Sequence, residues 1–394
     1  MNSNRFNLFS FGIFYLIIAC FIAILTEKLT IDEIATSEIL SFEFEEMIRI
    51  VAHDVHPPLF YIIVFWIYRV GYIYSVKLFS TFCGIGTMYV IYDILRLKTR
   101  WIDSKLLTIL IISIPNLVLH FTIARMYGLF ILLEALNLNL TIRLIDGRFI
   151  KENNKFHLVI LLFTRILSLY THYFSIIMLA FNVLFISIDI IYLLFKSKTE
   201  NNCQKIIFEI SCIVLLILCI FTLFPWIGFQ YQQITDEQIN WGFLGVDGLL
   251  SFMTMMNSLQ HDPQVAYALI LYVNDGFNLY GALWPRNPVR FIVNISITFL
   301  YLFYVIMDLK ISDIKEKITL ISILVLFLLS FFSFYVLMSS YSIPHYSRYL
   351  SPVIFYLLLP IAMNNVPRSR FSNKRIFEAI IVVNIFSYIS FFIE

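Results

Sequence analysis

The stretch FGIFYLIIACFIAILT, residues 11–26, carries no charged side chain and indicates the fold class of this chain. A helix needs about 20 mostly apolar residues to cross the hydrocarbon of a bilayer. Similar runs, among them residues 106–122 and 321–338, recur with short polar gaps in a sequence that is 60% hydrophobic and 14% charged. Because an open sheet cannot satisfy its backbone hydrogen bonds in lipid, we predict an all-α polytopic membrane protein. The first run follows Arg5 without a small-residue cleavage site, which predicts an uncleaved first helix.

Composition also argues against two classes of partner and site. The net charge of +2 is small and no basic stripe is interleaved with aromatic residues, so no nucleic-acid partner is expected. Four of the five cysteines lie in apolar runs, which is typical of buried packing thiols. We therefore expect neither a disulfide framework nor a thiolate metal site.

The positive charges predict how the chain is threaded through the membrane. Residues 57–70 form an apolar run of 14 residues before Gly71, which is too short to cross at about 1.5 Å per residue. If this run does not cross, 19 of the 28 Lys and Arg residues fall inside and 8 outside, with Arg165 within a span. The positive-inside rule favours this arrangement. It predicts a cytoplasmic N-terminus and an interfacial helix at 57–70 on the outer face.

About eleven transmembrane helices follow from this threading. The predicted spans are residues 8–26, 76–95, 104–122, 126–145, 157–171, 173–195, 206–224, 291–307, 318–338, 349–363 and 376–392. We predict one membrane-embedded domain over residues 1–394, in which the outer loops 27–75 and 228–290 form the active-site face. Acidic and apolar residues alternate at near-helical spacing in the first of these loops, as expected for amphipathic helices resting on the membrane.

Short polar motifs on the predicted outer side carry a resemblance to a known family. They occur in the order DE (32–33), HPPL (56–59), ARMY (124–127), THYF (171–174), PW (225–226) and SRY (347–349). A polytopic chain with this order resembles the GT-C membrane glycosyltransferases. It is most similar to the glycosyltransferase family 39-like branch, which includes protein O-mannosyltransferases and the lipid A aminoarabinose transferases. The similarity covers residues 8–364 approximately, and each motif alone is short.

The resemblance implies a function and a place for it. Such enzymes transfer a sugar from a polyprenyl-phosphate-linked donor to a glycan, lipid or protein acceptor on the outer or lumenal face, with inversion at the anomeric carbon. The plasma membrane is the expected location if the chain is prokaryotic. The lipid A branch has a lysine before its proline pair, whereas this chain has His56. A titratable group or metal ligand therefore replaces a fixed phosphate-binding cation.

The family's acidic pair falls on Asp32 and Glu33. Inverting transfer needs a base that takes the acceptor proton, and we assign this role to Asp32, with Glu33 in support. The alternative is that TIDE simply starts a helix, with Asp32 or Thr30 as its cap.

Cations that meet a lipid phosphate are expected at outer helix ends. Arg125, which matches the family's outer arginine, and Arg348 are the candidates. The alternative for both is snorkelling to headgroups. The candidate substrate-binding residues are His56, Arg125, Tyr127, His345, Arg348 and Tyr349, with Trp226 as a further aromatic candidate.

A divalent metal is a second interpretation of the histidines near the proline pair. Asp54 and His56, with His53 beside them, are candidate ligands together with His172, because imidazole and carboxylate suit zinc or manganese. The alternative is an ordinary cap-and-turn cluster at a helix start.

Two opposite charges lie within predicted spans. We interpret Glu134 and Arg165 as a buried structural ion pair rather than as catalytic groups. A transporter or flippase of lipid-linked sugars is the alternative function, but it would need broken helices and a polar path through the midplane. The chain has only 12 glycines and few midspan charges, which favours the enzyme. A catalytically inactive partner of a glycosyltransferase stays open as a third interpretation.

Overall fold

The computed structural model of this chain describes residues 4–25, 29–52, 56–98, 104–112, 115–146, 155–195 and 200–229. Seven of the predicted spans fall on these residues, and the four spans predicted between 291 and 392 lie outside them. Within the described ranges the chain is helical and contains no strand. This confirms the all-α prediction for that part, while the number of eleven spans stays a prediction.

The helices of the bundle follow the predicted spans closely. They are α1 (Asn4–Leu25), α4 (Leu59–Lys98), α5 (Ser104–Ile112), α6 (Pro115–Thr122), α7 (Tyr127–Ile145), α9 (Lys155–Thr171), α10 (Ser175–Phe195) and α11 (Glu200–Leu218), which continues into a 3-10 turn, η1 (Cys219–Leu223). Two short helices, α2 (Ile31–Ser41) and α3 (Phe44–Ala52), fill the first polar loop. The predicted span 104–122 corresponds to two consecutive helices, α5 and α6.

Several of these helices have the length and composition of membrane spans. Within the described ranges four stretches meet both criteria, and they are Leu59–Leu97, Tyr127–Ile145, Ser175–Phe195 and Asn202–Phe229. Two shorter apolar helices, Gly12–Leu25 and Phe156–Thr171, lie beside them. These helices are compatible with an integral membrane protein that contains a helical bundle.

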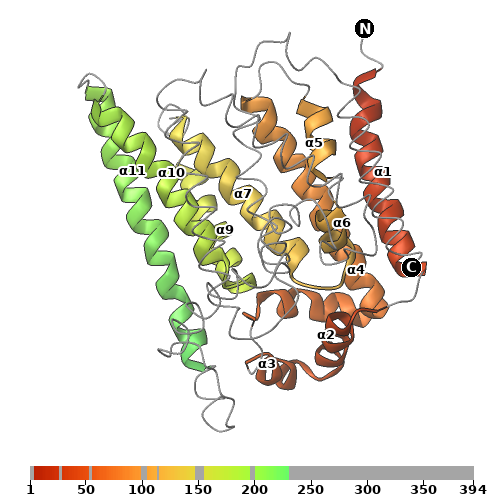
Figure 1. Cartoon of the computed structure of the whole chain (residues 1–394). Coiled ribbons are helices and arrows are strands. Elements are labelled where there is room, and N and C mark those ends of the chain that lie inside the picture. The colour runs from red at the N-terminus through yellow and green to blue at the C-terminus, as the bar shows by residue number, and fades with distance from the viewer. Residues whose placement is uncertain are drawn as a thin grey trace, which may run out of the picture.

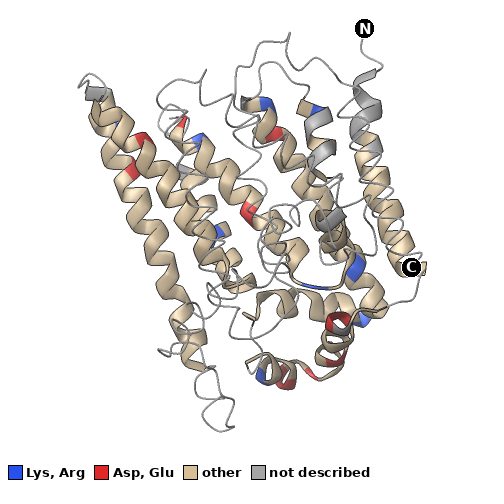
Figure 2. Cartoon of the chain, in the orientation of Figure 1, with Lys and Arg blue, Asp and Glu red and all other residues tan. Residues whose placement is uncertain are grey.

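The bundle is a row of helices with α7 in its interior. Figure 1 shows the long helices side by side, from α1 at one edge to α11 at the other, with α2 and α3 across one end. Nearly every residue of α7 is buried, because this helix packs against α4, α9 and α10. We call the end that α2 and α3 cover the α2–α3 end. Charged residues lie at this end and at the opposite end of the bundle, whereas the middle of the long helices carries few (Figure 2).

α4 is interrupted by a kink close to where the predicted interfacial helix ends. Gly71 has φ −145° and ψ 26°, and Tyr72 has φ 51° and ψ −148°, so neither residue is helical. Without this break, α4 would be about 60 Å long, twice the thickness of the hydrocarbon core. Its first part packs against α2 and α3 at the α2–α3 end, through a core that includes Leu40, Met47 and Phe60. The short run before Gly71 is thus distinct from the long helix that follows, as predicted.

Candidate active site

The first turn of α2 carries the acidic pair and is held by a capping box. The Thr30 hydroxyl accepts a hydrogen bond from the Glu33 backbone N at 3.2 Å, and the Thr30 backbone N donates to Glu33 Oε2 at 2.9 Å. This reciprocal pair satisfies two donors that a helix start leaves open. TIDE therefore starts a helix with Thr30 as its cap, and Asp32 is not the capping residue. Asp32 is half-buried in the same turn.

Glu33 joins α2 to two other segments. Its Oε1 accepts a hydrogen bond from the Ala124 backbone N at 2.9 Å and lies 3.2 Å from Lys77 Nζ on α4. Lys77 also donates to the carbonyl of Ala23 at 3.1 Å. Glu33 and Lys77 are both buried, at 1% and 2% exposure. Because both Glu33 oxygens hold protein groups, its side chain positions neighbouring segments rather than facing a substrate.

Arg125 lies between α6 and α7, directly against α2. Its Nη1 donates to Thr36 Oγ1 at 3.0 Å, to the Asp32 carbonyl at 3.4 Å and to Tyr61 Oη at 3.4 Å. Only 7% of Arg125 is exposed. A snorkelling arginine would extend its guanidinium toward headgroups. The structure instead encloses this cation among protein groups and brings it next to the acidic pair.

Two histidines from distant segments meet beside Arg125. The rings of His56, just before α4, and His172, between α9 and α10, have centroids 5.2 Å apart. Tyr127 at the start of α7 is 6.0 Å from His172. All three side chains are buried. Four of the predicted site residues, His56, Arg125, Tyr127 and His172, therefore form one cluster at the α2–α3 end.

Burial and a nearby cation both oppose protonation of the two histidines. Burial, followed by the charge of Arg125, lowers the pKa of His56 well below its ordinary value. The pKa of His172 is also well below its ordinary value, because of burial, then His56, then Arg125. The backbone N of Phe174 donates to His172 Nδ1 at 3.2 Å. Because Nδ1 accepts this hydrogen bond, the ring proton of a neutral His172 is on Nε2.

Four residues of this cluster were not predicted from the sequence. They are Thr36, Tyr61, Lys77 and His120, whose buried ring lies 5.0 Å from that of Tyr127. A lysine within an apolar helix indicates a paired or functional residue, so Lys77 could have been predicted from the sequence. Thr36 and Tyr61 offered none, because they are 89 and 64 residues away from Arg125 in the chain.

The remaining predicted site residues are Trp226 and several residues outside the described ranges. Trp226 packs against the same core cluster as Tyr127. Residues Asp54, His345, Arg348 and Tyr349, and most of loop 228–290, lie outside the described residues. Among the residues that the structure does describe, no group of three or more His, Cys, Asp or Glu side chains has the arrangement of a metal site.

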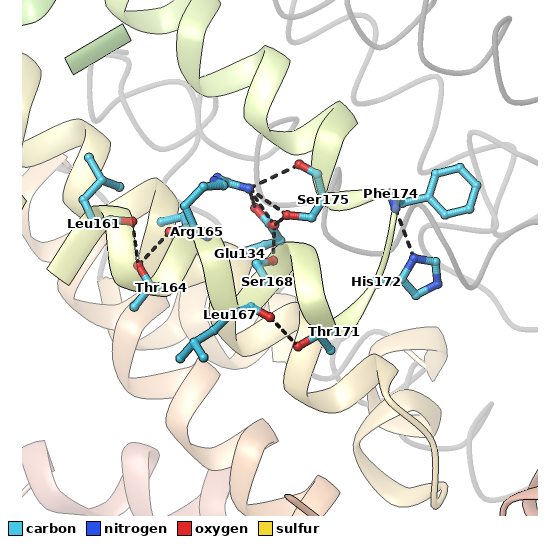
Figure 3. A network of polar contacts seen from close by, with 11 residues as sticks. Glu134, Leu161, Thr164, Arg165, Leu167, Ser168, Thr171, His172, Phe174 and Ser175 are labelled. Carbon is cyan, nitrogen blue, oxygen red and sulfur yellow. Dashed lines mark hydrogen bonds and ion pairs between the residues drawn. The ribbon is translucent and has the colours of Figure 1, made fainter. Parts of the chain in front are cut away.

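The predicted ion pair within the spans is present. Arg165 Nη1 lies 2.8 Å from Glu134 Oε1 and 3.1 Å from Oε2, and both side chains are fully buried. Figure 3 shows this pair between α7 and α9, with Ser168 and Ser175 beside it. Its interpretation as a structural pair agrees with these contacts.

Comparisons with known proteins add no further assignment. No protein-family model matches the sequence, and neither a curated protein nor a solved structure is significantly similar to it. The groups of the cluster alone therefore indicate its chemistry. A buried guanidinium and two buried imidazoles lie next to the first turn of α2, which carries Asp32 and Glu33. Groups of these kinds can bind an anion and accept a proton.

Proposed function

We propose that this chain is a membrane glycosyltransferase that uses a polyprenyl-phosphate-linked sugar and acts at the predicted outer face. The observation that supports it most is the buried Arg125, which lies against Asp32 and beside His56 and His172. At the predicted outer face the protein would meet anionic lipid headgroups, and a guanidinium can hold two phosphate oxygens in parallel. The motif resemblance supplies the reaction class.

In this proposal the reaction is an inverting displacement. The acceptor oxygen attacks the anomeric carbon, the bond from that carbon to the phosphate oxygen breaks, and polyprenyl phosphate leaves with the bonding electrons. Asp32 takes the acceptor proton as general base. Arg125 stabilises the charge that develops on the leaving phosphate, and the Nε2–H of His172 is a second donor for it.

Glu33 has a positioning role in this mechanism. Its contacts with Ala124 and Lys77 fix the first turn of α2 relative to the segment that carries Arg125. The distance between Asp32, the proposed base, and Arg125, the residue proposed to bind the phosphate, therefore depends on Glu33. The buried carboxylate of Glu33 does not itself face the substrate. Holding reacting groups in register is a large part of enzymatic rate enhancement.

A divalent metal does not fit the described part of this cluster. Two imidazoles are available, but the guanidinium of Arg125 is close enough to lower the pKa of both, and its charge opposes a second cation.

The proposed function is tested in two steps, first by identifying the acceptor in cells and then by assaying the purified protein. Mass spectrometry of surface glycans and lipids, from cells with and without this chain, identifies the product. Reconstituted protein is then given undecaprenyl- or dolichyl-phosphate hexoses with that acceptor, and release of polyprenyl phosphate is measured. Movement of the lipid-linked sugar across the bilayer without transfer would favour the flippase, and neither transfer nor movement would favour an inactive partner.

Arg125 variants connect the reaction to the cluster. Arg125→Lys keeps one mobile charge and should retain part of the turnover, whereas Arg125→Ala should retain little. If the charge acts mainly as phosphate leaves, turnover falls more than donor affinity. Equal activity of wild type and Arg125→Ala, at equal amounts of folded protein, would remove Arg125 from the site.

A further inference from the structure

The buried ion pair between α7 and α9 lies next to the turn that carries His172. Glu134 belongs to α7, and Arg165 belongs to α9, seven residues before His172. Both side chains are fully buried, and Arg165 Nη1 contacts both carboxylate oxygens of Glu134. A charge pair of this kind is costly in a bilayer, and an apolar pair of similar volume would pack the two helices equally well.

The same carboxylate holds both sides of the turn. Ser168, four residues before His172, and Ser175, three residues after it, both donate their hydroxyl groups to Glu134 Oε1, the latter at 2.8 Å. Arg165 Nη1 also donates to Ser175 Oγ at 3.0 Å and to its carbonyl at 3.3 Å. Figure 3 shows the two serines converging on Glu134, with His172 at the end of α9.

Backbone hydrogen bonds carry this restraint to His172. The backbone N of His172 donates to the Ser168 carbonyl at 3.0 Å, and the backbone N of Ser175 donates to the His172 carbonyl at 3.0 Å. The Phe174 backbone N then fixes the ring through Nδ1 at 3.2 Å. Anchoring both serines therefore restrains the backbone and the imidazole of His172 together.

α7 supplies both the anchor and the surface on which His172 rests. The ring of His172 stacks on Phe130 at 4.9 Å and lies 6.0 Å from Tyr127. Phe130 and Tyr127 precede Glu134 on α7 by one and two turns, which is about 6 and 10 Å along the axis. α7 thus carries the residue that anchors the turn and those that contact the His172 ring. Arg125 lies two residues before the start of the same helix.

We propose that Glu134 and Arg165 are positioning residues that hold the His172 imidazole next to Arg125. This inference rests on the proposed function for its catalytic meaning, because it gives the pair a role in orienting a phosphate donor. The ion pair fixes the positions of Ser168 and Ser175, and these serines fix the backbone of the turn. The turn then fixes the imidazole ring of His172.

The decisive variant keeps the ion pair and removes its links to the turn. Ser168→Ala/Ser175→Ala deletes both hydroxyl groups without leaving a buried charge unpaired. Thr164→Val is the matched control, because Thr164 is also on α9 and its buried hydroxyl also bonds to α7, at 2.8 Å from Asn137 Oδ1. It removes an interhelical hydrogen bond without touching the turn.

Histidine ring nitrogens report the position of His172 without any assay of transfer. The full chain, with its 7 histidines labelled with 15N, is measured in lipid nanodiscs, and His172→Gln identifies the signal. We expect one neutral Nε2–H form in wild type and in Thr164→Val. The double serine variant should show a mixture of the two neutral tautomers. In the transfer assay its kcat should fall about tenfold, while KM changes less than about twofold, since a misplaced group affects the transition state more than binding.

Two results would overturn the inference. One is a His172 signal in the double serine variant that is identical to that of wild type. The other is the same tautomer mixture in Thr164→Val, which would indicate general loosening of the bundle. If the His172 signal changes only in the serine variant but no protein transfers sugar, the positioning role stands and the proposed function fails.

Discussion

Asp32 is the residue on which the proposed chemistry depends most. Asp32→Asn keeps the shape of the side chain and removes the base, so transfer should fall by about 100-fold or more. Binding of polyprenyl phosphate should persist, because Arg125 is unchanged. The control is Glu38→Gln, which neutralises an exposed acid on the same helix. Near-full transfer by a folded Asp32→Asn protein would show that another group is the base.

Lys77 and Glu33 form the ion pair that fastens α2 to the bundle. Lys77→Met leaves the buried carboxylate with only its backbone donors, and we expect the free energy of unfolding to fall by about 3–5 kcal/mol. The double variant Lys77→Met/Glu33→Gln should be less destabilised than the sum of the single variants, because no charge is left unpaired. Unfolding in one detergent at several denaturant concentrations gives these values.

The exposed pair Arg49–Glu46 provides the control for this cycle. Its atoms are 3.7 Å apart and its side chains are 65% and 51% exposed. Arg49→Met should therefore change stability by about 1 kcal/mol or less. Strict additivity in the Lys77–Glu33 cycle would mean that the two buried groups do not interact energetically.

At the scale of the element, α4 contains a strained residue that allows its first part to lie along the α2–α3 end. Tyr72 has φ 51°, a conformation that glycine adopts freely and tyrosine does not. Tyr72→Gly should raise the free energy of unfolding by about 1 kcal/mol, since such strain costs about 1–3 kcal/mol and the side chain is largely exposed.

Tyr74→Gly is the matched variant on the regular part of the same helix. There glycine should lower stability by about 1 kcal/mol, as it does in helix interiors. Thermal unfolding of the two full-length variants in the same detergent measures the contrast. Destabilisation of equal size in both would show that Tyr72 is not strained in the folded protein.

At the scale of the whole molecule, the threading through the membrane is open to a direct test with a native cysteine. Cys203 is exposed, whereas Cys20, Cys83, Cys212 and Cys219 are buried. Because the charge pattern places residues 196–205 inside, an impermeant thiol reagent should leave Cys203 unlabelled in intact cells and label it after permeabilisation.

The opposite face is tested in the same way. In a Cys203→Ser background, Glu43→Cys introduces one thiol at an exposed position between α2 and α3. It should react in intact cells, because residues 27–56 are predicted to be outside. Labelling of Cys203 without permeabilisation would reverse the threading and, with it, the proposed face of the site.

The helices could be predicted from the sequence because their causes are local. A run of apolar residues satisfies its backbone within itself and its side chains with lipid, so its length and composition are sufficient to predict a span. The same reasoning separated residues 57–70 from the following helix, since too few apolar residues precede Gly71. The structure has non-helical dihedrals at Gly71 and Tyr72. Opposite charges in two spans likewise predicted the pair of Glu134 and Arg165, because neither charge is stable alone in lipid.

Only the tertiary structure decided which polar groups meet and what each of them does. Glu33 reaches Ala124 across 91 residues of chain, and His172 meets His56, because α7 packs between α4, α9 and α10. The sequence motif predicted that Asp32 and Glu33 act together in the reaction. The structure separates them, because packing encloses the Glu33 carboxylate among donors and leaves Asp32 half-buried at the helix start. The physical reason is that a helix face is defined by local spacing, whereas the partner of a buried charge depends on which helices pack together.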